Sequence, residues 1–158
     1  MERRSFLAVG AALGASLSLP RGAYAADVAP LVVIVSRSNL LDSVSLGLLR
    51  RIFLAEPIDT AGIRAVPFNT SPHTAERVLF DARVLGMSPN EAARYWVDQR
   101  IRGKEGSPRA VTGVRLLKQV VARLPGAISY VSHRDLDTSV KALPVGGHDW
   151  THRDYPLR

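Results

Sequence analysis

The 158-residue sequence contains no cysteine, few aromatic residues and no apolar segment of the ~20 residues that a membrane-spanning helix needs. Without cysteine, disulfides, thiolate nucleophiles and cysteine-ligated metals are excluded. Aromatic residues make up 6% of the chain and the basic residues are scattered, which argues against a nucleic-acid surface. We therefore expect a domain that is stabilised by packing alone and that binds no nucleic acid.

The first 25 residues have the parts of a signal peptide. Arg3 and Arg4 precede a short apolar stretch, and an A-x-A cleavage site stands at Ala23–Ala25. The arginine pair resembles the twin-arginine export signature, and it also fits an ordinary secretory signal. Either route predicts a periplasmic or secreted protein that begins at Ala26 or Asp27 and does not span the membrane after cleavage.

Removal of residues 1–25 leaves 133 residues, enough for one domain with a hydrophobic core. The whole chain carries a formal charge of +7, and the removed segment holds three arginines and one glutamate, so the remainder carries +5. Most cations are arginines, whose planar guanidinium groups suit oxyanions, although an arginine-rich genome would give the same composition. We expect a domain at 26–145 and a polar, loosely held C-terminal tail at 146–158.

Strands alternate with helices along the chain, which predicts an α/β fold with a central β-sheet flanked by helices. Apolar β-branched runs and period-two alternation predict strands at 31–35, 63–68, 127–131 and 140–145. Helical spacing and cap residues predict helices after Ser45, Thr74, Ser88 and Thr112, which end near residues 54, 85, 101 and 124. Glycine, proline and charge predict a loop at 102–110.

The clearest local signal is Ser88-Pro89-Asn90-Glu91, in which Ser88 is the N-cap, Pro89 the first helical residue and Glu91 the partner in a capping box. The first helix should bury Leu48 together with its neighbours Ile52 and Phe53. The apolar faces of the elements predict this core: Ile52, Phe53, Phe80, Leu117, Val121, Ile128 and Val131.

Few residues form a pattern that supports catalysis or metal binding. His148 and His152 have the spacing of a zinc pair on a helix, but Gly146, Gly147 and Pro156 argue against a helix there. No nucleophile elbow or catalytic triad is recognisable. We therefore expect no enzymatic activity, no cofactor and no metal site.

The segment Asn69–Thr74 leaves a predicted strand and enters a predicted helix. Free backbone N–H groups and hydroxyl side chains meet at such a helix N-terminus, and this geometry attracts anions. Serine and threonine also serve there as plain helix caps. The segment is thus either an anion site or an ordinary helix start.

Three stretches together resemble the phosphate-binding protein of bacterial ABC importers, a type 2 periplasmic binding protein. They are Leu46–Phe53, Val66–Phe80 and Leu124–Val131, and Gly103-Lys104 with Thr112-Gly113 is similar to the family's glycine-rich loop. The resemblance covers residues 31–143 but only about half of the family's two-lobed architecture. It implies a single type 2 binding-protein-like lobe that is not an enzyme.

The family's phosphate motif is an arginine followed a few residues later by Ser-Gly-Thr at a helix N-terminus. Alignment through Phe80 places Thr74 at the serine, Thr70 at the arginine and Ala75 at the glycine. Arg77 is then either a partial substitute for the missing arginine or a surface charge. The resemblance implies an anion site made of Thr70, Ser71, His73, Thr74 and Arg77.

Two functions follow from this resemblance. The leading hypothesis is a binding-protein-like domain that weakly recognises phosphate or another small oxyanion in transport or sensing. The alternative is an interaction or scaffold module that has lost its ligand and serves a periplasmic or membrane protein partner. Anion-dependent thermal stability would separate the two.

Overall fold

The computed structural model describes residues 29–104 and 106–158, so the predicted signal peptide and its cleavage site lie outside the described residues. No helix in the described part is long and apolar enough to cross a bilayer. A five-stranded sheet forms the centre of the molecule. Its strands are β1 (Leu31–Val35), β4 (Val66–Thr70), β5 (Arg109–Val111), β6 (Ala127–Ser132) and β7 (Lys141–Leu143).

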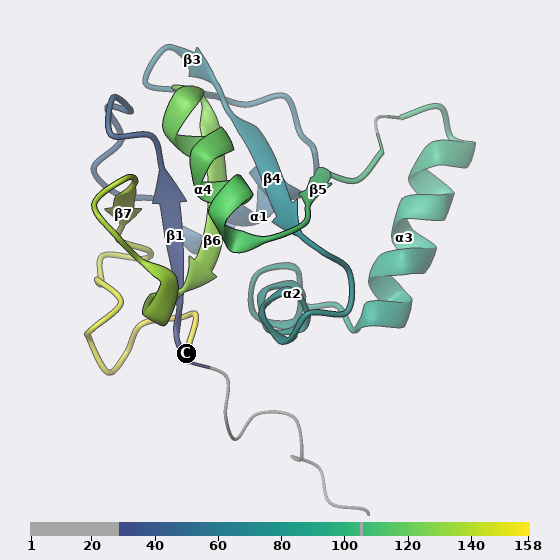
Figure 1. Ribbon diagram of the computed structural model, residues 1–158. Coiled ribbons are helices and arrows are strands. Elements are labelled where there is room, and N and C mark those ends of the chain that lie inside the picture. Colours follow the sequence, from purple (N-terminus) through teal and green to yellow (C-terminus); the bar gives the residue numbers. More distant parts are fainter. Residues whose placement is uncertain (1–28, 105) are drawn as a thin grey trace, which may run out of the picture.

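The strand order in this sheet is β5-β4-β6-β1-β7 (Figure 1). β4 runs parallel to β5 and β6, whereas β1 runs antiparallel to β6 and β7. The carboxyl ends of β4, β5 and β6 therefore lie at the same edge of the sheet.

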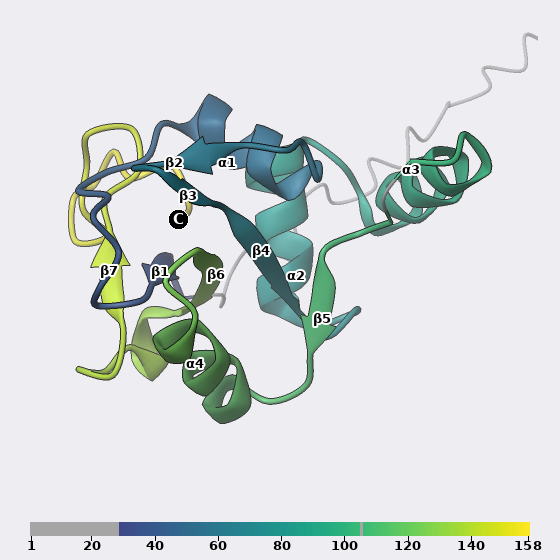
Figure 2. The same ribbon diagram turned by 90° about the horizontal axis from the view of Figure 1, so that it is seen from above.

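Helices cover both faces of the sheet, as the view from above shows (Figure 2). α1 (Leu46–Phe53) and α2 (Ala75–Phe80) pack on one face, and α4 (Val114–Arg123) packs on the other. α3 (Pro89–Ile101) projects to the side of the sheet. Short elements complete the described chain: β2 (Asp59–Thr60), β3 (Ile63–Arg64), the π-helical turn η1 (Asp81–Leu85) and the 3-10 turn η2 (His133–Asp135).

β1 lies in the middle of the core because both of its faces are apolar. Leu31, Val33 and Val35 face α1 and α2, while Val32 and Ile34 face α4. All five residues are buried. A continuous β-branched run is what a strand covered by helices on both sides requires.

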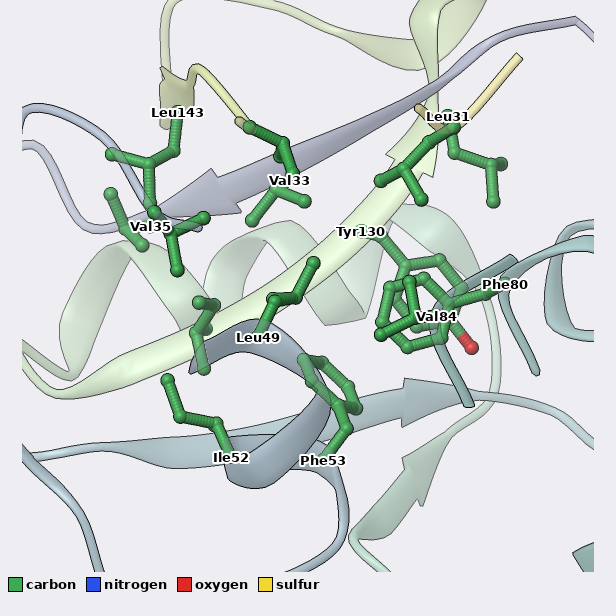
Figure 3. Close-up of a cluster of buried hydrophobic side chains, with 14 of the residues drawn as sticks. Leu31, Val33, Val35, Leu49, Ile52, Phe53, Phe80, Val84, Tyr130 and Leu143 are labelled. Carbon is green, nitrogen blue, oxygen red and sulfur yellow. The ribbon is translucent and has the colours of Figure 1, made fainter. Parts of the chain in front are cut away.

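Three aromatic rings join the sheet to the helices that cover it (Figure 3). The rings of Phe80 and Tyr130 stack at 3.8 Å between centroids, and Phe53 lies 4.5 Å from Phe80. All seven core residues predicted from the sequence are buried, which confirms that prediction. On α1, however, Leu49 is buried and Leu48 is only partly so, because the apolar face is turned by one residue.

The predicted strand at 63–68 is divided in two. Ala65 leaves the ladder because its N–H donates to the carbonyl oxygen of Ile58 at 2.9 Å. The chain then enters β4, where the N–H of Val66 donates to the carbonyl oxygen of Gly126 at 2.8 Å. A Cβ on Gly126 would collide with the carbonyl oxygen of Arg64, so this close approach requires glycine.

The predicted loop at 102–110 contains the start of a strand. β5 pairs with β4 through Arg109, Ala110 and Val111, and only the last of these is buried. So short a segment has no readable alternation of its own, and its pairing with β4 makes it a strand. The prediction of a pure loop was wrong there.

The helix ends show where local signals succeed and fail. Ser45, Thr74 and Ser88 cap their helices as predicted. Thr112 does not, because α4 begins after Gly113 with no side-chain cap. The helix after Thr74 changes to the π-helical η1 at Asp81 and stops at Gly86, whose φ of +67° is left-handed.

The C-terminal segment is held more firmly than its polarity suggested. Tyr155 and Leu157 are buried in the core, and the carbonyl oxygen of Leu157 accepts from the N–H of Leu31 at 3.0 Å. Burial raises the pKa of the Tyr155 hydroxyl to about 12. The expectation of a loosely held tail was wrong for these residues, since two apolar anchors suffice to fix it.

Candidate functional site

The loop between β4 and α2 opens at the carboxyl edge of the parallel strands. β4 ends at Thr70, and Thr74 caps α2 by accepting from the N–H of Arg77 at 3.2 Å. Between them, His73 takes a left-handed φ of +70°, which completes the tight turn. Ligands of open α/β sheets bind in the crevice outside this edge, so the sequence positions the loop where a ligand site is expected.

A second loop meets the first at this edge. β5 ends at Val111, and the next residue, Thr112, accepts a hydrogen bond at its Oγ1 from Ser71 Oγ at 3.2 Å. Thr112 is exposed and Ser71 is partly so. The hydroxyl that the sequence suggested as a helix cap therefore lies beside the predicted anion loop.

The hydroxyl of Thr70 is turned into the protein. Thr70 Oγ1 lies 3.1 Å from Thr74 Oγ1 and 3.4 Å from the hydroxyl oxygen of Tyr130, which itself donates to Asn69 Oδ1 at 3.3 Å. Burial raises the pKa of the Tyr130 hydroxyl, so it remains a neutral donor. Sequence reasoning missed Asn69 and Tyr130, because the contact joins residues about 60 positions apart.

Arg77 is held by a neighbour on its own helical segment. Its Nε donates to Asp81 Oδ2 at 2.7 Å, and both side chains are largely buried. Burial raises the pKa of the Asp81 carboxyl, and the positive charge of Arg77 opposes that rise. Part of the positive charge that Arg77 could offer to an anion is therefore neutralised. The i, i+4 spacing of the two residues was a readable signal for this pair.

The first turn of α2 retains hydrogen-bond donors. Within the part of the chain that the structure describes, the N–H groups of Ala75 and Glu76 have no hydrogen-bond acceptor. Such N–H groups carry the positive end of the helix dipole. The carboxylate of Glu76, also in this turn, opposes an incoming anion.

The five predicted site residues fall into two groups. Thr70, Ser71 and Thr74 share the network of hydroxyl groups at the end of β4. His73 and Arg77 instead line a cavity of about 340 Å³ between α2 and α3. The structure thus brings together the hydroxyl residues, and it places the two basic residues beside them on another surface.

The two histidines with metal-like spacing lie in the C-terminal segment. The rings of His148 and His152 stack at 4.4 Å between centroids, and the segment that holds them is a series of turns. Among residues 29–104 and 106–158, no cluster of three or more histidine or acidic side chains could hold a metal ion.

No protein-family model matches the chain. Several solved structures, however, match its fold. An ABC-type phosphate transport receptor from Vibrio cholerae is 16% identical, with a TM-score of 0.60 over 77% of this chain and 48% of the receptor. A phosphate ABC transporter substrate-binding protein from Clostridium perfringens, solved with bound phosphate, is 18% identical, with a TM-score of 0.62 over 77% of this chain and 46% of its own. The protein has the fold of these substrate-binding proteins.

PstS from Borrelia burgdorferi shares this binding-protein fold, with 15% identity and a TM-score of 0.55 over 74% of this chain and 47% of its own. The chain spans about half the length of the binding proteins it matches. The predicted fold class is confirmed: an α/β binding-protein-like lobe with a central sheet flanked by helices. The matched proteins are substrate-binding proteins rather than enzymes.

Proposed function

We propose that the protein is an exported, non-enzymatic binding-protein-like domain that weakly recognises phosphate or another small oxyanion at the N-terminus of α2. The observation that carries this proposal is the pair of N–H groups at Ala75 and Glu76, which have no acceptor among the described residues and lie at the carboxyl edge of the parallel strands. The loop that leads into α2 adds the hydroxyl group of Ser71, which donates to Thr112 Oγ1 at the end of β5. The fold is that of phosphate-binding proteins, which supports an oxyanion as the ligand.

The contacts of Thr70 and Arg77 explain why binding at this site should be weak. Thr70 stands where the resembling family has its arginine, and its hydroxyl is turned toward Thr74 and Tyr130. Arg77 is paired with Asp81. Contacts to a helix dipole contribute only about 0.3–1 kcal/mol each, and about −4 kcal/mol in total corresponds to a Kd near 1 mM.

The alternative function is an interaction module for a periplasmic or membrane protein. It is favoured by the contacts of the Thr70, Thr74 and Tyr130 hydroxyl groups, because these groups already have hydrogen-bond partners within the protein. The exposed Val97 and Ile101 on α3 also offer an apolar surface to a partner. In this case phosphate would have no effect on the protein.

Substitution of Ala75 by proline tests the site. Ala75 is the first residue of α2 and is exposed, and proline is well tolerated at this position because it removes an N–H that the helix does not use. Thr74 already has the extended backbone that precedes proline. Ala75→Pro should weaken phosphate binding severalfold, as measured by calorimetry on residues 26–158, without lowering the melting temperature.

Substitution of Glu76 by glutamine is the matched variant of opposite sign. It removes the carboxylate that opposes an anion in the same turn, so Glu76→Gln should tighten phosphate binding. Equal binding by both variants and the unchanged protein would refute the site. A melting temperature indifferent to phosphate and sulfate would favour the interaction module.

A further inference from the structure

Charge is distributed unevenly along the chain. Residues 106–134 contain five arginine and lysine residues and no aspartate or glutamate, whereas the rest of residues 26–158 contains thirteen charges of each sign. The whole excess of +5 therefore comes from this acid-free segment, which comprises β5, α4, β6 and the start of η2. A local excess of one sign is typical of a surface that meets a partner of the opposite charge.

Helix α4 holds three of these five cations. It lies in front of the sheet in Figure 1, and its residues Leu117 and Val121 are buried against the sheet. The exposed residues of α4 include two cations and a leucine, namely Arg115, Arg123 and Leu116. Lys118 is paired with Asp137, whereas neither arginine forms an ion pair within the part of the chain that the structure describes.

Exposed leucines accompany these arginines. Leu116 is 51% exposed, and Leu124, which follows α4, is 44% exposed. The loop after β1 is tied to this end of α4, because Asn39 Nδ2 donates to the carbonyl oxygen of Pro125 at 2.7 Å. That loop carries Leu40, which is 72% exposed. Large apolar side chains that gather at a surface mark an interaction site.

An anionic bilayer complements this combination of residues. Lipid phosphates give it a continuous negative surface, and an apolar layer lies directly beneath them. The long stems of arginines let their guanidinium groups stay at the phosphates while neighbouring leucines enter the apolar layer. Protein interfaces, in contrast, are enriched in aromatic anchors, and the only such residue of the acid-free segment, Tyr130, is buried.

We propose that the exposed side of α4, with the adjoining loop that holds Leu40, binds the surface of an anionic phospholipid bilayer. Leu40, Leu116 and Leu124 enter the apolar layer. Arg115 and Arg123 lie among the lipid phosphates. The proposed oxyanion site lies at the start of α2, which packs on the opposite face of the sheet. Failure of either proposal therefore leaves the other standing.

Co-sedimentation of residues 26–158 with vesicles tests this proposal. The probes are vesicles of phosphatidylcholine alone and vesicles in which about one third of the lipid is phosphatidylglycerol, which is anionic. The protein should bind only the anionic vesicles, and sodium chloride should weaken this binding because it screens the charges. Sodium polyglutamate is the probe for an acidic protein partner.

The double variant Arg115→Gln with Arg123→Gln should weaken binding to the anionic vesicles about 25-fold, because each arginine at such a surface contributes about fivefold. Arg94→Gln with Arg100→Gln is the matched control. It removes the same charge from exposed positions of α3 and should have little effect. The comparison separates binding through α4 from a general effect of net charge.

Leu116→Gln should weaken binding severalfold, because an apolar contact with the bilayer is lost, whereas Ile101→Gln at an exposed position of α3 should not. Both positions are exposed, so the variants should keep the parent's melting temperature. The leucine and arginine variants test the proposal separately if one of them misfolds. The proposal is overturned if the protein binds both kinds of vesicle equally or neither, or if the α3 control loses as much binding as the α4 variant. It is equally overturned if Leu116→Gln binds as tightly as the parent, or if polyglutamate is bound and the anionic vesicles are not.

Discussion

The sheet and helix α3 are held in place by different means. In β1 every residue is buried, and Phe53, Phe80 and Tyr130 join the sheet to α1 and α2. In α3, by contrast, only Ala92 and Trp96 of thirteen residues are buried. Yet α3 has the complete capping box, while α1 and α2 are capped by a single hydroxyl each. Local hydrogen bonds define α3, and long-range packing defines the sheet.

This difference bears on function because the proposed oxyanion site lies near the boundary between the two regions. The oxyanion site rests on α2, which the aromatic cluster fixes to the sheet. The cavity that His73 and Arg77 line has α2 as one wall and the lightly packed α3 as the other.

The largest effect should come from the aromatic cluster. Phe80 is fully buried against Phe53 and Tyr130, so Phe80→Ala should lower the free energy of unfolding by about 3–5 kcal/mol. Val97→Ala, at an exposed position of α3, is the matched control and should change it by less than about 0.5 kcal/mol. Urea denaturation measures both. Similar losses for the two variants would remove the distinction between the regions.

The buried ion pair should give the next largest effect. Asp81→Ala leaves the largely buried guanidinium of Arg77 without its carboxylate, which should cost about 3 kcal/mol of stability. The double variant Arg77→Met with Asp81→Leu should recover most of that loss, because two apolar side chains can replace a buried pair. Urea denaturation measures the free energy of unfolding of the single and double variants. A double variant no more stable than Asp81→Ala would show that the pair is not coupled.

The cap of α3 should matter less than the core. The side chain of Ser88 accepts from the N–H of Glu91, so Ser88→Ala should cost about 1 kcal/mol. Hydrogen exchange should show the loss in α3 and little change in β1 and β6, because the cap acts on α3 alone. Equal loss of protection in α3 and β1 would mean that the two regions unfold together.

The smallest expected effect is the pH dependence of the same cap. Hydrogen bonds from the backbone N–H and the hydroxyl of Ser88 hold the pKa of Glu91 below its ordinary value of 4.5. Because the folded pKa is the lower one, this stabilisation is present above pH 4.5 and is lost as the pH falls through the folded value. Glu91→Gln should therefore flatten the fall of the melting temperature between about pH 5 and 3. An unchanged acid slope would contradict this assignment.

Local signals in the sequence predicted the sheet's central strand, three helix caps and the core. Ser45, Thr74 and Ser88 could be read because a cap depends on residues three positions away. β5 could not be read, because its three residues are a strand only through pairing with β4. Likewise, Leu157 is fixed by Leu31, far away in the chain.

The candidate site was predictable in its place but not in its contacts. The loop at the end of β4 and the start of α2 followed from turn and cap residues around Thr74. The orientation of Thr70 could not be foreseen, because it is fixed by Tyr130 on another strand. Nor could the cavity shared by His73 and Arg77, since it exists only where α3 passes α2.

The central claim, that the start of α2 binds a small oxyanion, is tested most directly by following backbone amide signals while phosphate is added to residues 26–158. The account predicts shifts concentrated in residues 70–78, largest at Ala75 and Glu76, whose N–H groups have no acceptor among the described residues. The Kd should be on the order of 1 mM or weaker. Shifts centred elsewhere, or none at tens of millimolar phosphate, would contradict it.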